Sequence, residues 1–132
     1  MSLTGQEQFT KYFFLGELAA NSSAIKSVLM TTPSGYTLQL KGAKIGADTA
    51  ITAQASNYQD IQVKTVGGTC LAWFSNNSSG GGTITAGDFS DMTTIKTLIP
   101  ASTTIQVTYV QANSGQAWSG AVIQLDLEPY LV

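Results

Sequence analysis

The amino-acid sequence predicts an all-β fold, either a sandwich or a barrel. Apolar and polar residues alternate over several short stretches, which is typical of strands with one face in a core and the other in water. Clusters of Gly, Pro, Asn and Ser separate these stretches, and no convincing long helix is indicated. With 132 residues, of which 43% are hydrophobic, the chain has room for one core and not for two.

The first residues differ in character from the rest. Thr4 is followed three residues later by Glu7, which resembles a helix capping box. Phe9, Phe13 and Leu18 lie near helical spacing. These features predict a short helix, but the same aromatic-rich segment equally suits an extended arm, and the sequence leaves both open.

A first strand is expected in residues 24–30, "AIKSVLM", because a turn with Pro and Gly follows at residues 32–35. We therefore divide the chain into residues 1–30, an N-terminal arm or short helix with the first strand, and residues 31–132, a single β-sandwich domain.

The next strand, "YTLQLKGAKI", changes its pattern in the middle. Leu38 and Leu40 share one parity, whereas Ala43 and Ile45 share the other. Gly42 lies at the change, as it would at a β-bulge that bends the strand.

A hairpin is predicted where "DIQVKTV" leads through Gly67 and Gly68 into "TCLAWF". The run "CLAWF" does not alternate, because Leu71 and Trp73 face away from the equally apolar Ala72 and Phe74. Either both faces are covered within the domain, or another subunit covers one of them. The polar stretch from Ser75 to Gly82 then predicts a hairpin loop at an exposed tip.

Three further strands are predicted by alternation over residues 93–99, 103–109 and 121–127, which are rich in Thr, Ile and Val. They bring the expected number of strands to seven or eight.

Charge excludes some classes of function. All six basic residues are Lys, there is no Arg, and the net charge is −2, which argues against nucleic-acid binding. Neither a secretion signal nor an apolar run long enough for a membrane span is found, so we expect a soluble protein made in a cytoplasm. Cys70 is the only cysteine, so no intrachain disulfide is expected, and its apolar surroundings predict a buried, inert thiol.

Few residues of the chain are candidates for catalysis or metal binding. The chain has no histidine, which removes Ser-His-Asp and Cys-His arrangements. Asp126 and Glu128 share a strand face and are the pair considered for an acid-based hydrolase. Asp88 and Asp91 offer oxygen ligands for calcium, although a simple turn explains them better. We predict that the protein is not an enzyme and needs no cofactor or metal.

Aromatic and apolar side chains are the candidates for binding. Trp118, in the loop-like "NSGQAWSG", and Tyr109 are candidate contacts to a ligand or at the tip, because sugars stack on exposed aromatic rings. Candidate contacts to other subunits are Phe9, Tyr12, Phe13, Phe14, Leu71 and Trp73.

From Tyr36 onward the order of segments resembles a known family. The run "LQLKGAKIGADTAITAQASNYQDIQVKTVGGTCLAWF" is followed by a Gly/Ser loop and then by "GTITAGDFSDMTTIKTLIPASTTIQVTYVQANSGQAWSGAVIQLDLEP". This order is similar to the small jelly-roll domains of head decoration (cement) and head fibre proteins of tailed bacteriophages. The family's "D…T…A…NY" segment is matched by Asp48, Thr49, Ala53, Asn57 and Tyr58.

The resemblance implies a jelly-roll-like antiparallel sandwich that works as a virion structural protein, made in the host bacterial cytoplasm. Its partners would be further copies of itself, with a trimer favoured, and the major capsid protein of the shell that it reinforces. The N-terminal segment lies outside the match and would contact the capsid or a neighbouring subunit. The alternative is a carbohydrate-binding or host-recognition sandwich, with a glycan as its partner.

Overall fold

The computed structural model describes residues 9–18, 25–77, 82–111 and 117–130. Within these ranges the chain forms ten strands, several of them very short, and no helix. The strands are β1 (Phe9–Leu18), β2 (Ile25–Thr31), β3 (Thr37–Gly46), β4 (Gln59–Thr65), β5 (Cys70–Ser75), β6 (Phe89–Asp91), β7 (Thr93–Thr94), β8 (Leu98–Ile99), β9 (Thr104–Gln111) and β10 (Trp118–Tyr130). No helix long and apolar enough to cross a membrane occurs in the described part of the chain.

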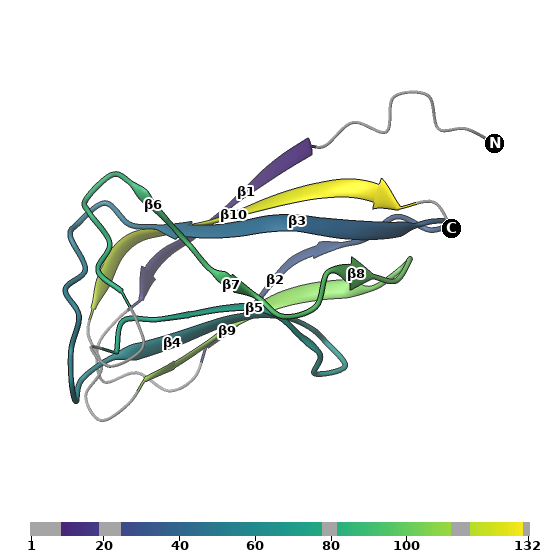
Figure 1. Cartoon of the computed structure of the whole chain (residues 1–132). Helices are drawn as coiled ribbons and strands as arrows, with labels where there is room; N and C mark the ends of the chain where they lie inside the picture. The colour runs from purple at the N-terminus through teal and green to yellow at the C-terminus, as the bar shows by residue number, and fades with distance from the viewer. Residues whose placement is uncertain (1–8, 19–24, 78–81, 112–116, 131–132) are drawn as a thin grey trace.

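The strands form two antiparallel sheets packed face to face (Figure 1). Sheet A has the order β1-β10-β3-β6, with β8 also paired to β3, and sheet B has the order β2-β9-β4-β5-β7. Only β4 and β5 are consecutive strands that pair with each other, because the other connections cross between the sheets. With β6 to β8 taken as one interrupted strand, this is the order of a jelly roll, so the expected all-β, jelly-roll-like sandwich is confirmed.

The core lies between the sheets and follows the alternation of the sequence. Ile123, Leu125 and Leu127 of β10 are fully buried, whereas the residues between them lie on the outer surface. The bulge predicted at Gly42 is confirmed, because Asp126 pairs with Gly42 and Leu127 with Leu40. The extra residue at this point keeps both halves of β3 facing the core.

A second bulge explains why "CLAWF" does not alternate. Ala72 pairs with Val63 and Cys70 pairs with Lys64, so Leu71 is an extra residue in β5. Leu71 and Ala72 are therefore both buried, although they are neighbours in the sequence. The predicted hairpin is confirmed, and its turn is closed by the N–H of Gly68, which donates to Thr65 O over 2.9 Å.

The single strand predicted for residues 93–99 is wrong, because the segment changes sheets. The N–H groups of Ile95 and Lys96 donate to Leu71 O in sheet B, over 2.8 and 3.3 Å. Only one residue later, Thr97 O accepts from Leu40 N–H in sheet A over 2.6 Å. The alternation of apolar and polar residues does not reveal this change of sheet, because both short strands, β7 and β8, are extended (Figure 1).

At the N-terminus the helical alternative is wrong over residues 9–18, which form the edge strand β1 paired with β10. Extended backbone directs Phe9, Phe13 and Leu15 toward the core, where they pack against buried residues. The proposed capping box lies outside the described residues. Because β1 and β2 are the edge strands of the two sheets, residues 9–18 and 25–30 are built into the sandwich.

Candidate docking face

The outer surface of sheet A carries three exposed aromatic rings. Tyr12 and Phe14 pair with Gln124 and Val122 of β10, whose side chains lie on the outer surface. Tyr12 is 57% exposed, Phe14 82% and Phe89, from β6, 41%. We call the outer surface of sheet A that bears these rings face A. Exposed aromatic groups of this kind mark sites where a protein contacts a partner.

A glycine lets these rings gather on the sheet. A Cβ atom at Gly46 would lie only 3.2 Å from Cδ1 of Phe89, so the phenyl ring rests directly on the backbone of β3. The same ring lies 6.2 Å from that of Tyr12, between ring centroids, at an interplanar angle of 51°. Tilted pairs at this separation attract each other, so Tyr12 and Phe89 hold one another in place across the sheet.

A small hollow adjoins the rings. It has a volume of about 170 Å³ and is lined by Gly46, Ala47, Asp48, Gly87, Asp88, Phe89, Gly120 and Val122. The carboxylate of Asp48 lies directly over the Cα of Gly120, where no larger residue would fit. Gly120 also has a φ of +62°, which L side chains rarely adopt. The N–H of Asp48 donates to Ser119 O over 2.8 Å, which fixes the position of the carboxylate at the rim.

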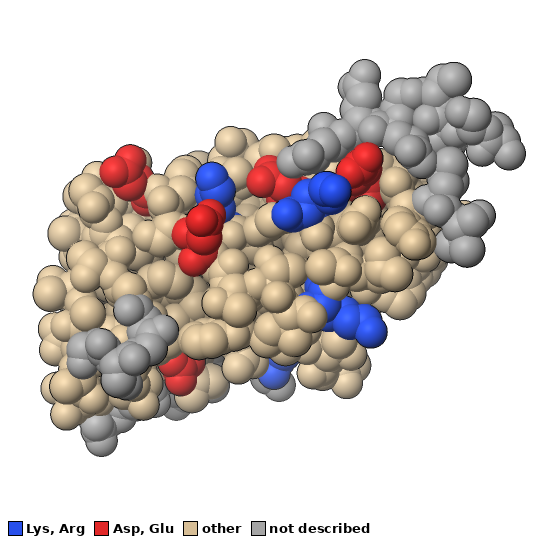
Figure 2. All heavy atoms as spheres, in the orientation of Figure 1, with Lys and Arg blue, Asp and Glu red and all other residues tan. Residues whose placement is uncertain are grey.

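Face A is negatively charged. Five carboxylates lie on it or on the rim of its hollow (Asp48, Asp88, Asp91, Asp126 and Glu128), against Lys41 and Lys44. Among the described residues the only salt bridge joins Lys41 to Glu128, at 3.7 Å, and both groups are partly exposed. Figure 2, in the orientation of Figure 1, shows a few scattered Lys, Asp and Glu side chains on a largely uncharged surface.

The outer surface of sheet B, which we call face B, is aliphatic and carries a lysine. Its register places Val28, Lys64, Trp73 and Val110 on this side. Both valines are exposed, whereas Lys64 and Trp73 are half-buried. Asp60, at the other end of β4 from Lys64, is the acid that the register places on the same side.

Cys70 lies beside Lys64 in the register of face B. It is half-buried, whereas the sequence predicts a buried thiol. Burial raises the pKa of the Cys70 thiol, and this effect exceeds the opposing influence of the Lys64 cation. Because the thiolate is the reactive form of cysteine, a raised pKa makes Cys70 a weaker nucleophile than an ordinary cysteine at the same pH.

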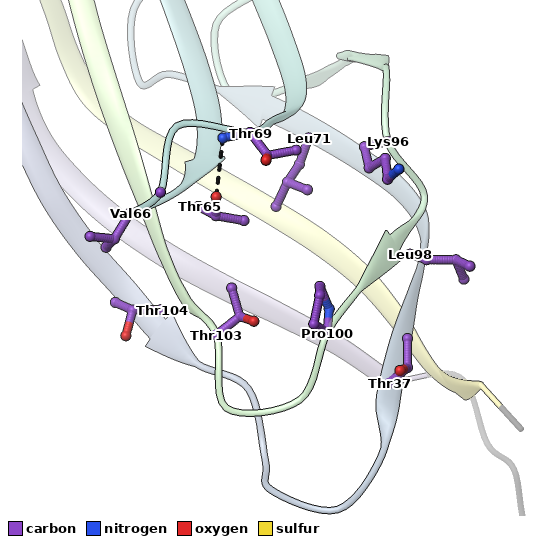
Figure 3. A pocket seen from close by; sticks show the side chains of 11 residues that line it. Thr37, Thr65, Val66, Thr69, Leu71, Lys96, Leu98, Pro100, Thr103 and Thr104 are labelled. Atoms are coloured by element: carbon purple, nitrogen blue, oxygen red, sulfur yellow. Dashed lines mark hydrogen bonds between the residues drawn. The ribbon is translucent and has the colours of Figure 1, made fainter.

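A larger cavity, of about 620 Å³, opens at one end of the sandwich. Thr65, Leu71 and the β4–β5 turn form one side, and the segment with Lys96, Pro100 and Thr103 forms the other (Figure 3). The volume is within the range of small-molecule sites.

Bonds within the protein already use several of the hydroxyl groups at this end. Thr65 Oγ1 accepts from Thr69 N–H over 3.1 Å (Figure 3), and Thr103 Oγ1 donates to Ala101 O over 3.3 Å. Thr104 and Thr31 share a hydrogen bond between their hydroxyl oxygens, at 3.0 Å. Lys96 is the one charged residue of the lining. These hydroxyl groups therefore connect the ends of the strands to one another, which leaves them less available to a ligand.

The structure separates the six residues predicted to contact other subunits. Tyr12 and Phe14 are exposed on face A, and Trp73 is half-buried on face B. Phe9 and Phe13 face the core instead, and Leu71 is completely covered within the domain. Of the two explanations offered for the apolar run "CLAWF", burial inside the domain is therefore the correct one for Leu71, which no other subunit is needed to cover.

The two residues predicted to contact a ligand lie in the core. Trp118 and Tyr109 are each 1% exposed, so neither ring presents a face to a sugar. Trp118 begins β10 and meets Phe74 edge-on, with ring centroids 6.0 Å apart at 77°. Ser119 and Gly120, which follow it in this loop-like stretch, belong instead to the long strand β10, and residues 113–116 lie outside the described residues.

Sequence reasoning also missed part of the site. Phe89 belongs to a strand of three residues, too short for an alternation to be recognised. Val28 and Val110 lie in strands whose expected faces were not assigned. The pairing of β2 and β9 with their neighbouring strands is needed to show that these side chains point away from the core.

The acidic candidates lie on the same surface. Asp126 and Glu128 share the outer side of β10 as expected, but Asp126 Oδ1 accepts from Thr10 Oγ1 over 2.7 Å, and Glu128 pairs with Lys41. Asp88 lines the hollow and Asp91 ends β6. Among the described residues no group of three or more His, Cys, Asp or Glu side chains comes together to hold a metal ion.

Comparison with known proteins adds little. No family model matches the chain, and no curated protein matches it. Among solved structures the chain is similar to one in "Structure of infectious bursal disease virus Gx strain", with 14% sequence identity over 91% of this chain and a TM-score of 0.37. The chain spans 33% of the length of that chain. A likeness this weak says nothing about what the protein does.

Proposed function

We propose that this chain is a structural protein of a virion, which associates with copies of itself and reinforces the head shell of a tailed bacteriophage as a decoration or cement protein. It works by binding and has no catalytic step. Support comes from the jelly-roll-like fold, from the order of segments that resembles decoration proteins, and above all from face A.

Face A is the observation that carries the proposal. Three aromatic side chains are exposed together on one rigid sheet, and one of them, Phe14, is 82% exposed. Apolar groups on this scale cost free energy in water unless a partner covers them. Aromatic residues contribute much of the binding energy in protein interfaces, and they lose little side-chain entropy when they are fixed there.

The chemistry of the remaining candidates also suits a binding role. The chain has no histidine, and burial raises the pKa of its only thiol. The acid pair considered for hydrolysis is engaged by Thr10 and Lys41.

The carbohydrate-binding alternative depended on Trp118 and Tyr109. Both lie in the core, so these residues do not support it.

The test is made on the virus whose genome encodes this chain. We expect gradient-purified particles to contain the protein in many copies, as measured by quantitative mass spectrometry. Particles from which the gene has been deleted are expected to release their genome at a lower temperature. Added wild-type protein should restore the original release temperature.

Matched variants connect this test to face A. Phe14→Ser should fail to restore the release temperature, because it removes the most exposed ring of face A. Val66→Ser should restore it, because Val66 is an exposed residue of the β4–β5 turn, away from face A. Purified particles without the protein, or deletion particles as heat-stable as the parent, would contradict the proposed function.

A further inference from the structure

We infer that face A binds face B of a second copy of this chain, in a head-to-tail contact that stacks copies on one another. The inference rests on the proposed function, because it names the partner that covers the aromatic rings. It follows from the charge and the apolar groups of the two faces and from the character of the β1 edge.

The charges of the two faces favour unlike contacts over like ones. Face A has five carboxylates against two lysines, so two copies joined through face A would bring two negative surfaces together. Like charges opposed in an interface cost several kcal/mol. Among the described side chains, face B has Lys64 on an inner strand of its sheet and one acid, Asp60, near one end. Face A therefore meets less repulsion on face B than on itself.

The apolar side chains of face A also differ in kind from those of face B, which again favours contact between unlike faces. Face A offers flat rings, with Tyr12 and Phe14 standing out from β1. Face B offers the exposed aliphatic side chains of Val28 and Val110 beside Trp73. A lysine near aromatic rings also gains cation–π attraction, which Lys64 would supply to the rings of the neighbouring copy.

The edge of sheet A offers a poorer route to assembly. β1 is an edge strand, and its Lys11 pairs in register with the buried Leu125, on the core side of the sheet. A charged residue pointing inward on an edge strand opposes the addition of another strand. Register shifts around Gly16, whose φ is +74°, further disturb the end of β1. Contact through the faces is therefore favoured over contact through this edge.

The size of the faces is sufficient. Sheet A is four strands wide in its main path. With strands about 4.8 Å apart and about eight residues long at about 3.3 Å each, one face projects about 500 Å². Two such faces bury about 1,000 Å² together, which reaches the lower limit for a specific interface. A contact between two different faces leaves one of each free at the ends, and because the two faces lie on opposite sides of the sandwich, further copies extend the stack.

The experiment measures mass by light scattering for the purified full-length protein and three variants. Wild type is expected to exceed the 13.9 kDa of one chain, with a mass that rises with protein concentration. Phe14→Asp on face A and Val28→Asp on face B are each expected to be monomers, with association weakened at least about 30-fold. Val66→Asp is the control, because Val66 is 58% exposed and Val28 65%, and it should keep the wild-type mass. Circular dichroism checks that each variant is folded.

Mixing the two broken variants tests the head-to-tail geometry. Phe14→Asp keeps an intact face B and Val28→Asp keeps an intact face A, so their mixture should form a one-to-one dimer of twice 13.9 kDa and nothing larger. A contact of face A with itself would instead leave Val28→Asp at the wild-type mass and give no mixed dimer. Either of these results, or a monomeric wild type at 100 µM, overturns the inference. The proposed function then still stands or falls by the presence of the protein in virions.

Discussion

Replacing Trp118 by Ala should strongly destabilise the protein without affecting any binding site. The side chain is 1% exposed and meets Phe74 edge-on. A buried Trp removes about 200 Å² from water, worth about 5 kcal/mol at about 25 cal/mol per Å² as an upper bound. Core Trp→Ala changes cost about 3–5 kcal/mol. We therefore expect a loss of about 4 kcal/mol from a total that is typically about 5–15 kcal/mol.

Urea denaturation measures this loss. With a slope of about 2 kcal/mol per M, the midpoint should fall by about 2 M. Trp73→Ala is the matched control, because Trp73 is half-buried on face B, and its expected cost is about 1 kcal/mol. Trp118→Phe should also cost about 1 kcal/mol, since it keeps a ring in the core and removes the indole N–H, which has no acceptor in the described part of the chain.

Fluorescence gives a second measurement, which does not require the Ala variant to fold. The chain has two tryptophans, so Trp73→Phe leaves Trp118 as the only one. Its emission should be blue-shifted and resist quenching by acrylamide. A cost below about 1 kcal/mol for Trp118→Ala, or emission typical of a tryptophan in water, would refute the placement of Trp118 in the core.

Two further predictions concern a glycine and the thiol. Gly120→Ala should cost about 1–2 kcal/mol more than Gly87→Ala; both glycines have positive φ, but only Gly120 lies under Asp48. Asp48→Ala in the Gly120→Ala background should recover most of that excess in denaturation, and full additivity of the two changes would contradict the contact. Because burial raises the pKa of Cys70, its reaction with a disulfide reagent should be slow at neutral pH and should still accelerate at a pH where an ordinary cysteine is already fully ionised. Lys64→Ala removes the cation that favours the thiolate and should slow the reaction at a given pH, so a faster reaction would refute this assignment.

Local features of the fold were predictable because neighbouring residues determine them. The period of two, rich in Thr, Ile and Val, indicates extended backbone wherever one face meets a core. The change of phase at Gly42 marks a bulge, since one extra residue is the only way to keep Leu40 and Ala43 on the same side of one strand. Gly67 and Gly68 likewise indicate the hairpin turn between β4 and β5.

The candidate site was only partly predictable, because exposure depends on residues far away in the chain. Tyr12 and Phe14 were recognised as contact residues, but so were Phe9 and Phe13, which the pairing of β1 with β10 turns toward the core. Phe89 joins the two exposed rings only because β6 lies in the same sheet as β1.

By itself the sequence determined an all-β chain of short strands, a bulge and a hairpin at glycines, a low charge and no histidine chemistry. Tertiary structure decided that Trp118 and Tyr109 belong to the core, that residues 93–99 pass from one sheet to the other, and that aromatic rings gather on face A. The reason is physical. Alternation gives every strand two faces, but only the packing of one sheet on the other decides which face is removed from water.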